Sequence, residues 1–499
     1  MLCAACRDIF SSPRKLAYGS IRRWQQTAGS FRQAVQAGCH LCNLVHENAS
    51  GSFSAHAWYS FKPLNPNWAR HGTGSKWCAF QGSTGDVWTP PNISLRAFEL
   101  DPTPNKLGSL LATESENLVK ETADSWVILE FYGANQVVLP MELSPVGAMD
   151  SFDDLAQRNL ASQTSTGEPE TLQLARAWLE SCLENHPSCR PRLPENQLPT
   201  RLIDVGSHQE PLLRLVSGAS LEGTSRYVAL SHRHSANMAF ILTPLNLAAY
   251  ETEIPASDIS DMIWDAIEVT RALGIQYLWA DCICIIHDDD GQDWAHEAQA
   301  MWKVYGLSTC TIAGANSGDE NEGLFSDRIP YRIRPYRVPS PFKTNSKCTF
   351  NIMSQYLNEI YEKEVRCTEW FKQGWVFQER TLAPRLLTFT RSQVLWGCSE
   401  LHAAETWPCG KTSKNYIDRF VSVAVEKARF ADVVDKQRGI VRSHAAWWTF
   451  LQDYMTTELT VPTDRLPAIQ GIAALVEELT GKRYCSGFWM TDDLPHALL

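Results

Sequence analysis

Residues 277–301 read YLWADCICIIHDDDGQDWAHEAQAM, and this stretch decides the fold class. It starts inside a near-continuous apolar run, residues 275–286, which is typical of a strand that is covered on both faces. Aspartates follow, and residues 292–306 then carry apolar side chains at helical spacing. A covered strand that ends in carboxylates and leads into a helix predicts a site at the strand end, with a catalytic acid on the helix behind it.

Two short apolar segments flank this stretch and complete a repeating pattern. Residues 226–231 (RYVALS) and 308–315 (STCTIAGA) are predicted strands, and residues 256–274 have the apolar spacing of a helix. Strand, helix, strand, helix and strand with short connections predict a parallel α/β sheet, in which ligands bind at the carboxyl ends of the strands. The candidate positions are just after Ser231, along residues 281–290 and just after Ala315.

The rest of the chain divides around this centre. Residues 1–160 contain two cysteine pairs and several strand-like segments, and a polar stretch near residues 160–171 is a predicted linker. We therefore expect an N-terminal, cysteine-containing, β-rich region over residues 1–160, an α/β core over residues 161–330 and a mostly helical C-terminal region over residues 331–499 that completes the cleft.

The overall composition narrows the class of protein. With 44% hydrophobic and 20% charged residues, the chain has the make-up of an ordinary globular protein. A formal net charge of -11 argues against a nucleic-acid partner and against an anionic membrane, because both require a basic face. No secretion signal and no apolar run of about 18 residues are present, so we expect a cytoplasmic protein whose cysteines are mostly reduced.

Ordered blocks along the whole chain resemble one known family. The blocks are GCHLCNLV, WLESCLENHPSC, LPTRLIDVG, RYVALS, residues 264–315, EGLF, GWVFQERTLAPRLLTF, DRLPAIQGIAAL and LTGKRYCSGFW. They resemble the fungal heterokaryon incompatibility (HET) domain family. This resemblance implies a core similar to TIR domains, with a flavodoxin-like parallel sheet, and an association with regulated fungal cell death. TIR-like folds can cleave the nicotinamide glycosidic bond of NAD with one glutamate, and by that analogy Glu297 is the best candidate.

The first predicted strand departs from the family pattern. The family usually follows this strand with Leu-Ser-Tyr-Cys-Trp-Gly, whereas this chain reads LSHRHS over residues 230–235. The arginine that typically precedes Gly-Trp is also absent, and Gln373 takes its place. Both departures fall at the predicted site, and the gain of two imidazoles and a guanidinium favours an altered enzyme over an unchanged death effector.

Four residues are the catalytic candidates. Glu297 could stabilise an oxocarbenium ion or donate a proton, although acidic residues also favour the first turn of a helix for electrostatic reasons. His232 and His234 suit acid–base chemistry near neutral pH, or are loop histidines bonded to the backbone. Asp281 ends the apolar run and either takes part in the site or fixes the strand-to-loop connection. We expect an imidazole from residues 232–234 to share a ligand with Glu297.

Further residues are expected to line the cleft and bind the substrate. Arg233 is a candidate anion clamp. The full substrate-binding set is Ser231, Arg233, Ser235, Trp294, Asn316 and Trp375. Glu379 and Arg380, in the GWVFQER block, either reach the cleft from the C-terminal part or form an interdomain ion pair, and we favour the ion pair.

Cys282 and Cys284 lie in the predicted strand, and Cys310 lies in a neighbouring one. A nucleophilic cysteine needs a partner base and exposure to the substrate. Because these cysteines fall in covered strands, packing in the core is the favoured interpretation.

Two pairs of cysteines near the N-terminus have the spacing of metal ligands. Cys3 and Cys6 form one pair, and Cys39 and Cys42 form the other, each with two residues between the thiols. Two such pairs fit a tetrahedral structural zinc site. The alternative is that Cys39 and Cys42 lie on a helix and only bury small apolar groups.

A second candidate metal cluster lies near residue 185. Cys182 and His186 share a helical face, and Cys189 follows three residues later. These residues supply three ligands, so a fourth must come from elsewhere in the fold. Such a site would be structural.

Two classes of function remain open on the sequence. The first is an enzyme that acts on a small molecule by carboxylate and imidazole acid–base chemistry: either NAD-type N-glycoside cleavage linked to regulated cell death, or a cyclisation or isomerisation in secondary metabolism. The second is a non-catalytic allorecognition scaffold that acts by self-association, so homo-oligomers are open. NAD enters only as a candidate substrate, and structural zinc is the candidate metal.

Overall fold

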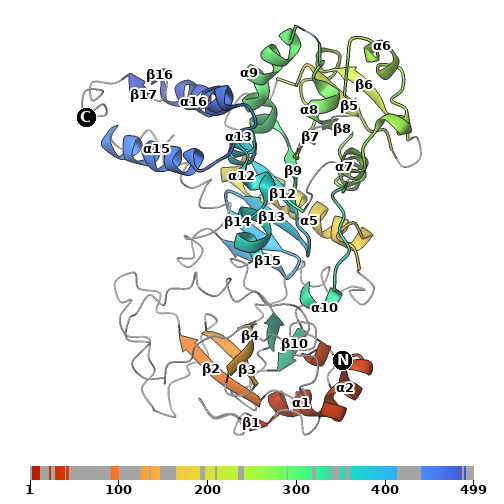
Figure 1. Cartoon of the computed structure of the whole chain (residues 1–499), viewed down its shortest axis with the longest axis vertical. Helices are drawn as coiled ribbons and strands as arrows, with labels where there is room; N and C mark the ends of the chain where they lie inside the picture. Colours follow the sequence, from red (N-terminus) through yellow and green to blue (C-terminus); the bar gives the residue numbers. More distant parts are fainter. Residues whose placement is uncertain are drawn as a thin grey trace. The chain divides into compact units, whose positions relative to one another are not determined.

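The structure is a computed structural model with two units, each built around its own sheet (Figure 1). The first unit consists of Met1–Asp150 and Ile329–Tyr356, and the second of Ser151–Arg328 and Leu357–Leu499. The residues that the structure describes are 3–11, 22–23, 28–39, 41–43, 92–99, 125–133, 136–145, 164–190, 197–207, 211–233, 241–288, 290–316, 322–333, 336–339, 349–353, 360–412, 440–485 and 488–490.

The first unit contains a six-stranded antiparallel sheet in the order β1-β2-β3-β4-β11-β10. Its strands are β1 Arg22–Arg23, β2 Asn92–Glu99, β3 Ser125–Gly133, β4 Gln136–Pro145, β10 Tyr336–Pro339 and β11 Thr349–Met353, and its helices are α1 Ala4–Ser11, α2 Ala28–Gln36 and α10 Pro330–Ile333. The sheet of the first unit therefore includes β10 and β11, two strands that lie beyond residue 330 and so outside the predicted region of residues 1–160.

The second unit contains a nine-stranded mixed sheet in the order β15-β14-β13-β12-β9-β7-β8-β5-β6. Its strands are β5 Arg201–Asp204, β6 Arg214–Ser217, β7 Tyr227–Ser231, β8 Tyr277–Trp279, β9 Cys310–Gly314, β12 Arg385–Phe389, β13 Val394–Cys398, β14 Leu401–Ala404 and β15 Trp407–Thr412. The four central strands are parallel, and antiparallel strands extend the sheet on both sides.

The order of the parallel strands fixes where a ligand site is expected. Along the chain the parallel strands come in the order β7, β8, β9 and β12, but in the sheet β7 lies between β8 and β9. This second-first-third-fourth arrangement is that of a flavodoxin-like doubly wound sheet. The α/β prediction is confirmed, and the switch in direction occurs at β7, whose carboxyl end is the expected binding position.

Helices join the parallel strands and cover the sheet. The helices of this unit are α5 Pro169–Asn185, α6 Leu247–Tyr250, α7 Asp261–Ala272, α8 Asp281–Cys284, α9 Gln292–Leu307, α12 Glu369–Lys372, α13 Gly374–Leu382, α15 Ile440–Met455 and α16 Pro467–Thr480. Short turns are η5 Pro187–Cys189, η6 Gly218–Ser220, η7 Ala256–Asp258, η8 Glu362–Arg366 and η10 Pro462–Arg465. The connection from β7 to β8 contains α7, and the connection from β8 to β9 contains α9, as the sequence pattern predicts.

The apolar run at residues 275–286 is only partly a strand, which corrects the sequence prediction. β8 ends at Trp279, and α8 begins two residues later. The N–H groups of Ile283 and Cys284 both donate to the carbonyl of Ala280, which closes a helical turn. A short buried run does not distinguish a strand from a buried helical turn by its pattern alone. Cys282 and Cys284 therefore lie on a short helix rather than on one face of a strand.

The last part of the chain contributes strands as well as helices. Strands β12–β15 extend the central sheet, while α13 and α16 pack against α9, and a hairpin of β16 Arg483–Cys485 and β17 Phe488–Met490 follows. Gly471 allows the close approach of α16, because a Cβ there would lie 2.2 Å from Gln378 Oε1 and 2.7 Å from Trp302 Cβ. Among the described helices, none combines the length and apolar character that crossing a bilayer requires.

Candidate functional site

A group of three side chains forms where two parallel strands end side by side. β7 ends at Ser231, and β8 pairs with it in parallel and ends at Trp279. Just beyond these ends, a ring nitrogen of His232, a carboxylate oxygen of Asp281 and the sulfur of Cys282 all lie within 4.8 Å of one another. The structure thus brings together two of the predicted catalytic residues and a cysteine that the sequence favoured as core.

These three side chains are shielded from solvent. His232 is 4% exposed and Cys282 is 1% exposed, while Asp281 is half-buried. The Asp281 carboxylate accepts a hydrogen bond from the N–H of Cys282 at 2.9 Å, which holds its orientation at the start of α8. An imidazole, a carboxylate and a thiol in contact range can support acid–base or nucleophilic chemistry, and the same three donors could hold a metal ion with an open coordination position.

Tyr305 and Glu379 extend this group on one side. Tyr305 lies on α9, is fully buried, and donates a hydrogen bond to the carbonyl of Leu230 at 3.0 Å. Burial raises the pKa of Tyr305 well above its usual value, and the carboxylates of Glu379 and Asp281 raise this pKa further. The phenol is therefore a neutral donor at physiological pH. We call His232, Asp281, Cys282, Tyr305 and Glu379 the strand-end cluster.

The GWVFQER block supplies Glu379 from α13. Arg380, the next residue, donates a hydrogen bond to the carbonyl of Phe371 at 2.9 Å and lies 3.7 Å from the centre of the Phe371 ring. The two neighbouring charged side chains thus have different surroundings, Tyr305 for Glu379 and an aromatic ring for Arg380. Glu379 thus brings the block to the strand end, and the interdomain ion pair stays a prediction.

Ser231 and Arg233, two predicted substrate-binding residues, flank His232. The Ser231 hydroxyl oxygen accepts a hydrogen bond from the Trp370 indole at 2.9 Å, and both side chains are fully buried. Ser231 therefore fastens α12 to the strand end. The pKa of the exposed Glu369 is lowered mainly by Lys372 and to a smaller degree by Arg233, so the guanidinium lies near that carboxylate. His234 and Ser235 lie outside the described residues.

Glu297 does not belong to the strand-end cluster. It is 2% exposed, so it is not a surface residue of the first helical turn, and its Oε1 lies 3.3 Å from Nδ1 of the exposed His296. It also lies close enough to Cys284 to affect that thiol: burial, and to a smaller degree Asp281 and Glu297, raise the pKa of Cys284 to about 12. The group that His232 forms with Asp281 and Cys282 does not include Glu297. The expected sharing of one ligand by His232 and Glu297 therefore stays a prediction, and Asp281 is the carboxylate beside His232.

The three remaining predicted lining residues have other partners. The rings of Trp294 and Trp375 meet edge to face at 6.2 Å, and the Trp375 indole donates a hydrogen bond to Asp464 at 3.2 Å. The side-chain amide of Asn316 donates to the carbonyl of Leu324 at 2.9 Å and to the hydroxyl of Ser326 at 2.9 Å. Asn316 thus holds the loop after β9, and the two tryptophans connect α9 with α13.

An ion pair that sequence analysis missed supports the same region. Arg201, at the start of β5, makes two hydrogen bonds to the carboxylate of Asp293, at 2.6 and 2.9 Å, and a third to the carbonyl of Cys284 at 2.9 Å. Burial raises the pKa of Asp293, but the hydrogen bonds from Arg201 and from the Ile286 N–H outweigh burial and hold it below its usual value. No local signal identifies this pair, because its members are 92 residues apart.

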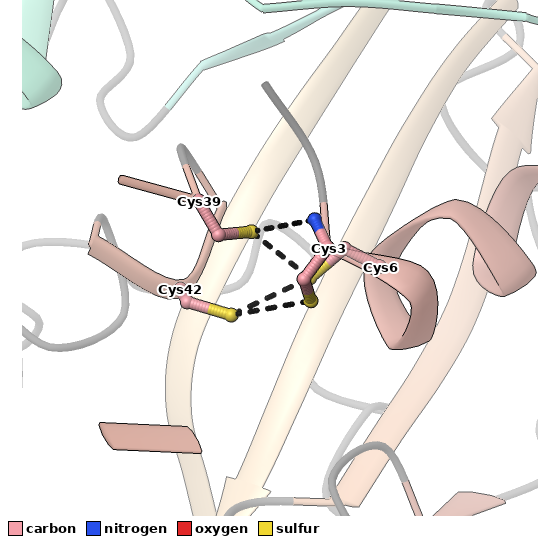
Figure 2. A group of neighbouring side chains, drawn as sticks. All are labelled: Cys3, Cys6, Cys39 and Cys42. Atoms are coloured by element: carbon pink, nitrogen blue, oxygen red, sulfur yellow. Dashed lines mark hydrogen bonds between the residues drawn. The ribbon is translucent and has the colours of Figure 1, made fainter. Parts of the chain in front are cut away.

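The four N-terminal cysteines form one cluster in the first unit, as predicted (Figure 2). The distances between sulfur atoms are 3.8 Å for Cys3 and Cys42, 3.6 Å for Cys6 and Cys42, and 3.7 Å for Cys6 and Cys39. The N–H of Cys3 also donates to the sulfur of Cys39 at 3.2 Å. These four residues, the N-terminal cysteine cluster, could hold a metal ion.

Local structure explains how these four thiols meet. Cys3 precedes α1 and Cys6 lies in its first turn, so the chain folds the two thiols toward each other (Figure 2). α2 ends at a turn with Gly38 in the left-handed region, at φ 73°, and Cys39 follows. A hydrogen bond from the Cys6 side chain lowers the pKa of Cys3 to about 6. At least one of these thiols is therefore ready to ionise, as metal binding requires.

A second four-residue cluster in the other unit completes the three-residue pattern that the sequence predicted. The ligand atoms of Cys182, His186, Cys189 and Cys398 lie within 4.8 Å of one another. Hydrogen bonds from the Cys182 and Cys398 side chains lower the pKa of Cys189 to about 2. We call these four residues the second cysteine cluster. Sequence analysis missed Cys398 because nothing near it in the chain indicates a ligand.

The sequence was compared with proteins and families already characterised. No curated protein and no solved structure matches the chain. One family profile matches, over residues 227–379, and its description is Heterokaryon incompatibility protein (HET). This range begins with the first residue of β7 and ends at Glu379, so it contains the whole strand-end cluster. Residues 227–379, which we call the HET domain, are therefore similar to the heterokaryon incompatibility (HET) family.

Proposed function

We propose that the HET domain acts on a small molecule at the strand-end cluster, through acid–base chemistry of His232 and Asp281. One observation carries this proposal: an imidazole, a carboxylate and a thiol lie within 4.8 Å of one another at the carboxyl ends of adjacent parallel strands, beside the switch point of the sheet. Doubly wound sheets bind their ligands at this position. Histidine is the side chain whose usual pKa suits proton transfer near pH 7.

Each member of the cluster has a role in this proposal. His232 takes a proton from the substrate and returns it at another atom, so that the side chain ends in its starting state. The Asp281 carboxylate stabilises the imidazolium that forms in between. Tyr305, which stays protonated because its pKa is raised, donates a hydrogen bond to an oxygen that gains negative charge. Cys282 is a candidate nucleophile, because its sulfur lies within 4.8 Å of a possible base, the His232 imidazole.

The two candidate reaction classes use different carboxylates, Glu297 in one and Asp281 in the other. Cleavage of an N-glycoside such as that of NAD needs a carboxylate against the oxocarbenium ion, and Glu297 is the candidate that the TIR analogy supplies. The grouping of His232 with Asp281 favours an isomerisation or cyclisation instead, because an imidazole beside a carboxylate suits proton transfer. Within this proposal, a role in fungal secondary metabolism ranks above NAD cleavage coupled to cell death.

Incubation of the purified full-length chain with NAD separates these two reaction classes. If the chain cleaves NAD, nicotinamide is released, and we expect Glu297→Gln to abolish the release. If the strand-end cluster performs the chemistry on NAD, His232→Gln and Asp281→Asn lower the rate at least 100-fold, while the exposed Cys367→Ser control keeps it. If neither the wild-type chain nor any variant releases nicotinamide, NAD is excluded as the substrate, and an isomerisation or cyclisation of another small molecule remains.

The burial of the cluster favours a second candidate function, a non-catalytic allorecognition scaffold. His232, Cys282 and Tyr305 are at most 4% exposed, and groups so enclosed often serve only to hold a fold together. Expression of His232→Gln in a fungal host distinguishes the two functions. A scaffold keeps its effect on cell viability and self-associates, which light scattering measures, whereas an enzyme loses the effect while circular dichroism stays unchanged.

For the N-terminal cysteine cluster, we propose a structural zinc ion. A tetrahedral zinc ion with Zn–S bonds of about 2.3 Å places its sulfur ligands about 3.8 Å apart. The measured separations of 3.6 to 3.8 Å agree with this value. Four thiolate ligands leave no open coordination position, so this site would stabilise the first unit and take no part in catalysis.

A further inference from the structure

We propose that the second cysteine cluster is also a zinc site, one that fastens α5 to β13. Its members are Cys182, His186, Cys189 and Cys398, and their ligand atoms lie within 4.8 Å of one another. This inference is independent of the proposed enzymatic function, because all four residues lie outside residues 227–379, which match the HET profile.

Three of the four ligands converge through local structure alone. Cys182 and His186 are four residues apart, so they lie on the same face of the helical segment. α5 ends at Asn185, and the N–H of His186 still donates to the carbonyl of Cys182 at 3.1 Å. Pro187 then stops the helix and begins η5, which returns Cys189 to the same place.

The fourth ligand comes from a strand far along the chain. Cys398 is the last residue of β13, and its sulfur lies 3.4 Å from Nδ1 of His186, 212 residues away in sequence. A tetrahedral zinc ion with a Zn–S bond of about 2.3 Å and a Zn–N bond of about 2.0–2.1 Å separates these two ligand atoms by about 3.5 Å. The two side chains therefore already stand at the separation that a shared ion requires.

The surroundings of the cluster suit thiolates. The guanidinium of Arg385 donates to the sulfur of Cys182 at 3.2 Å and to the carbonyl of Cys189 at 3.1 Å. The backbone N–H of Leu401 donates to the sulfur of Cys398 at 3.2 Å. Zn²⁺ with three thiolates and a neutral imidazole carries one net negative charge, which the Arg385 cation neutralises. Donors of this kind orient and stabilise the ligands of metal sites.

The position of the cluster explains what the ion would do. Cys182, Cys189 and Cys398 are each at most 1% exposed, and all three thiols are free. The indole of Trp178, one turn before Cys182, donates to the carbonyl of Pro408 at 2.7 Å, so α5 lies along the antiparallel part of the sheet. Four protein ligands leave no open position, which makes the site structural.

Zinc content of the reduced, full-length protein tests this proposal. With both cysteine clusters occupied, we expect two zinc ions per chain by mass spectrometry of the metal. Cys398→Ser should remove one of them, and the exposed Cys367→Ser should remove none. Cys42→Ser acts on the N-terminal cluster alone, so it separates failure of that site from failure of this one. A zinc content that Cys398→Ser leaves unchanged overturns the proposal.

A second variant keeps the test decisive if Cys398→Ser does not fold. His186→Cys retains four ligands and changes the set from three sulfurs and a nitrogen to four sulfurs. After replacement of zinc by cobalt, we expect this variant to keep its metal content and to show a stronger sulfur-to-cobalt charge-transfer band. A cobalt spectrum that is identical in the wild-type protein and in His186→Cys contradicts the proposed ligand set.

Discussion

The strand-end cluster and the second cysteine cluster lie in the same unit and use similar side chains, but they differ in number of ligands and in position. The second cysteine cluster has four metal-ligating groups where a helix meets the antiparallel part of the sheet. Within the strand-end cluster, only His232, Asp281 and Cys282 form such a group, at the carboxyl ends of parallel strands. Four ligands close a coordination shell, whereas three leave a position for a substrate or a water molecule.

The comparison teaches that residue type alone does not separate a structural site from a reactive one. Both clusters contain a histidine next to buried cysteines. In one, a guanidinium donates directly to a sulfur atom; in the other, the carboxylates of Asp281 and Glu379 act on Tyr305. A cationic neighbour stabilises thiolates for metal binding, while carboxylates stabilise a protonated imidazole. The four predictions below test this distinction in order of expected effect.

The largest expected effect is a difference in stability between Cys398→Ser and Cys282→Ser. If Cys398 binds zinc, its loss should lower the free energy of unfolding by about 3 kcal/mol or more, because metal binding contributes directly to folding. Cys282→Ser removes only a small buried thiol and should cost about 1 kcal/mol. Urea unfolding followed by fluorescence measures both values. Equal losses would show that the two clusters are alike in their contribution to stability.

Arg385→Met tests the role of the guanidinium beside the second cysteine cluster. Loss of a donor that orients the ligands should weaken zinc binding 10- to 100-fold. Competition with a chromophoric chelator measures this change. Arg176→Met, which removes an exposed guanidinium from α5, the helix that carries Cys182, is the control. Unchanged affinity would mean that Arg385 serves only to hold Cys189 and Thr309 through their carbonyls.

Asp293→Asn tests the ion pair that supports the strand-end cluster. The pKa of Asp293 is lowered in the folded protein, so its charge stabilises the fold above the unfolded pKa of about 3.9, and this contribution is lost as the pH falls through the folded pKa. At pH 7 we expect a loss of about 1–2 kcal/mol. This difference should begin to shrink below about pH 4 and vanish only below the lowered pKa of the folded state. A loss of stability that persists unchanged in acid would contradict this account.

An exposed ion pair serves as the control for the Arg201–Asp293 pair. Glu180 pairs with Arg176 on the surface of α5, with side chains 56% and 51% exposed. Because exposed pairs are screened by solvent, Glu180→Gln should change stability by well under 1 kcal/mol at any pH. If the two variants behave alike, the Arg201–Asp293 pair is no stronger than a surface contact.

The smallest effect is expected for Trp370→Phe. This change removes the indole donor to Ser231 but keeps most of the buried ring, so it should cost about 1 kcal/mol. Because Ser231 immediately precedes His232, we also expect lower activity at the strand-end cluster. Trp178→Phe, whose buried indole bonds the carbonyl of Pro408 instead, is the matched control. Equal effects on activity would show that the hydrogen bond to Ser231 does not position His232.

Most of the central fold was predictable, because its signals are local. The apolar runs at β7 and β9, and the helical spacing of α7 and α9, each arise within about fifteen residues. The segment after β8 was not predictable, since a covered strand and a buried helical turn carry the same apolar pattern. Cys282 is buried in the core, as predicted, but only α8 places it beside His232.

The candidate sites, like the fold, were only partly predictable from the sequence. The sequence by itself determined the α/β centre, the resemblance to the HET family, and the pairing of Cys182 with His186, because helical spacing fixes which residues share a face. Only the tertiary structure decided that Cys398 completes that group and that Asp281 and Cys282 lie beside His232. Contacts between residues hundreds of positions apart depend on which strands become neighbours, and the packing of the whole unit decides that.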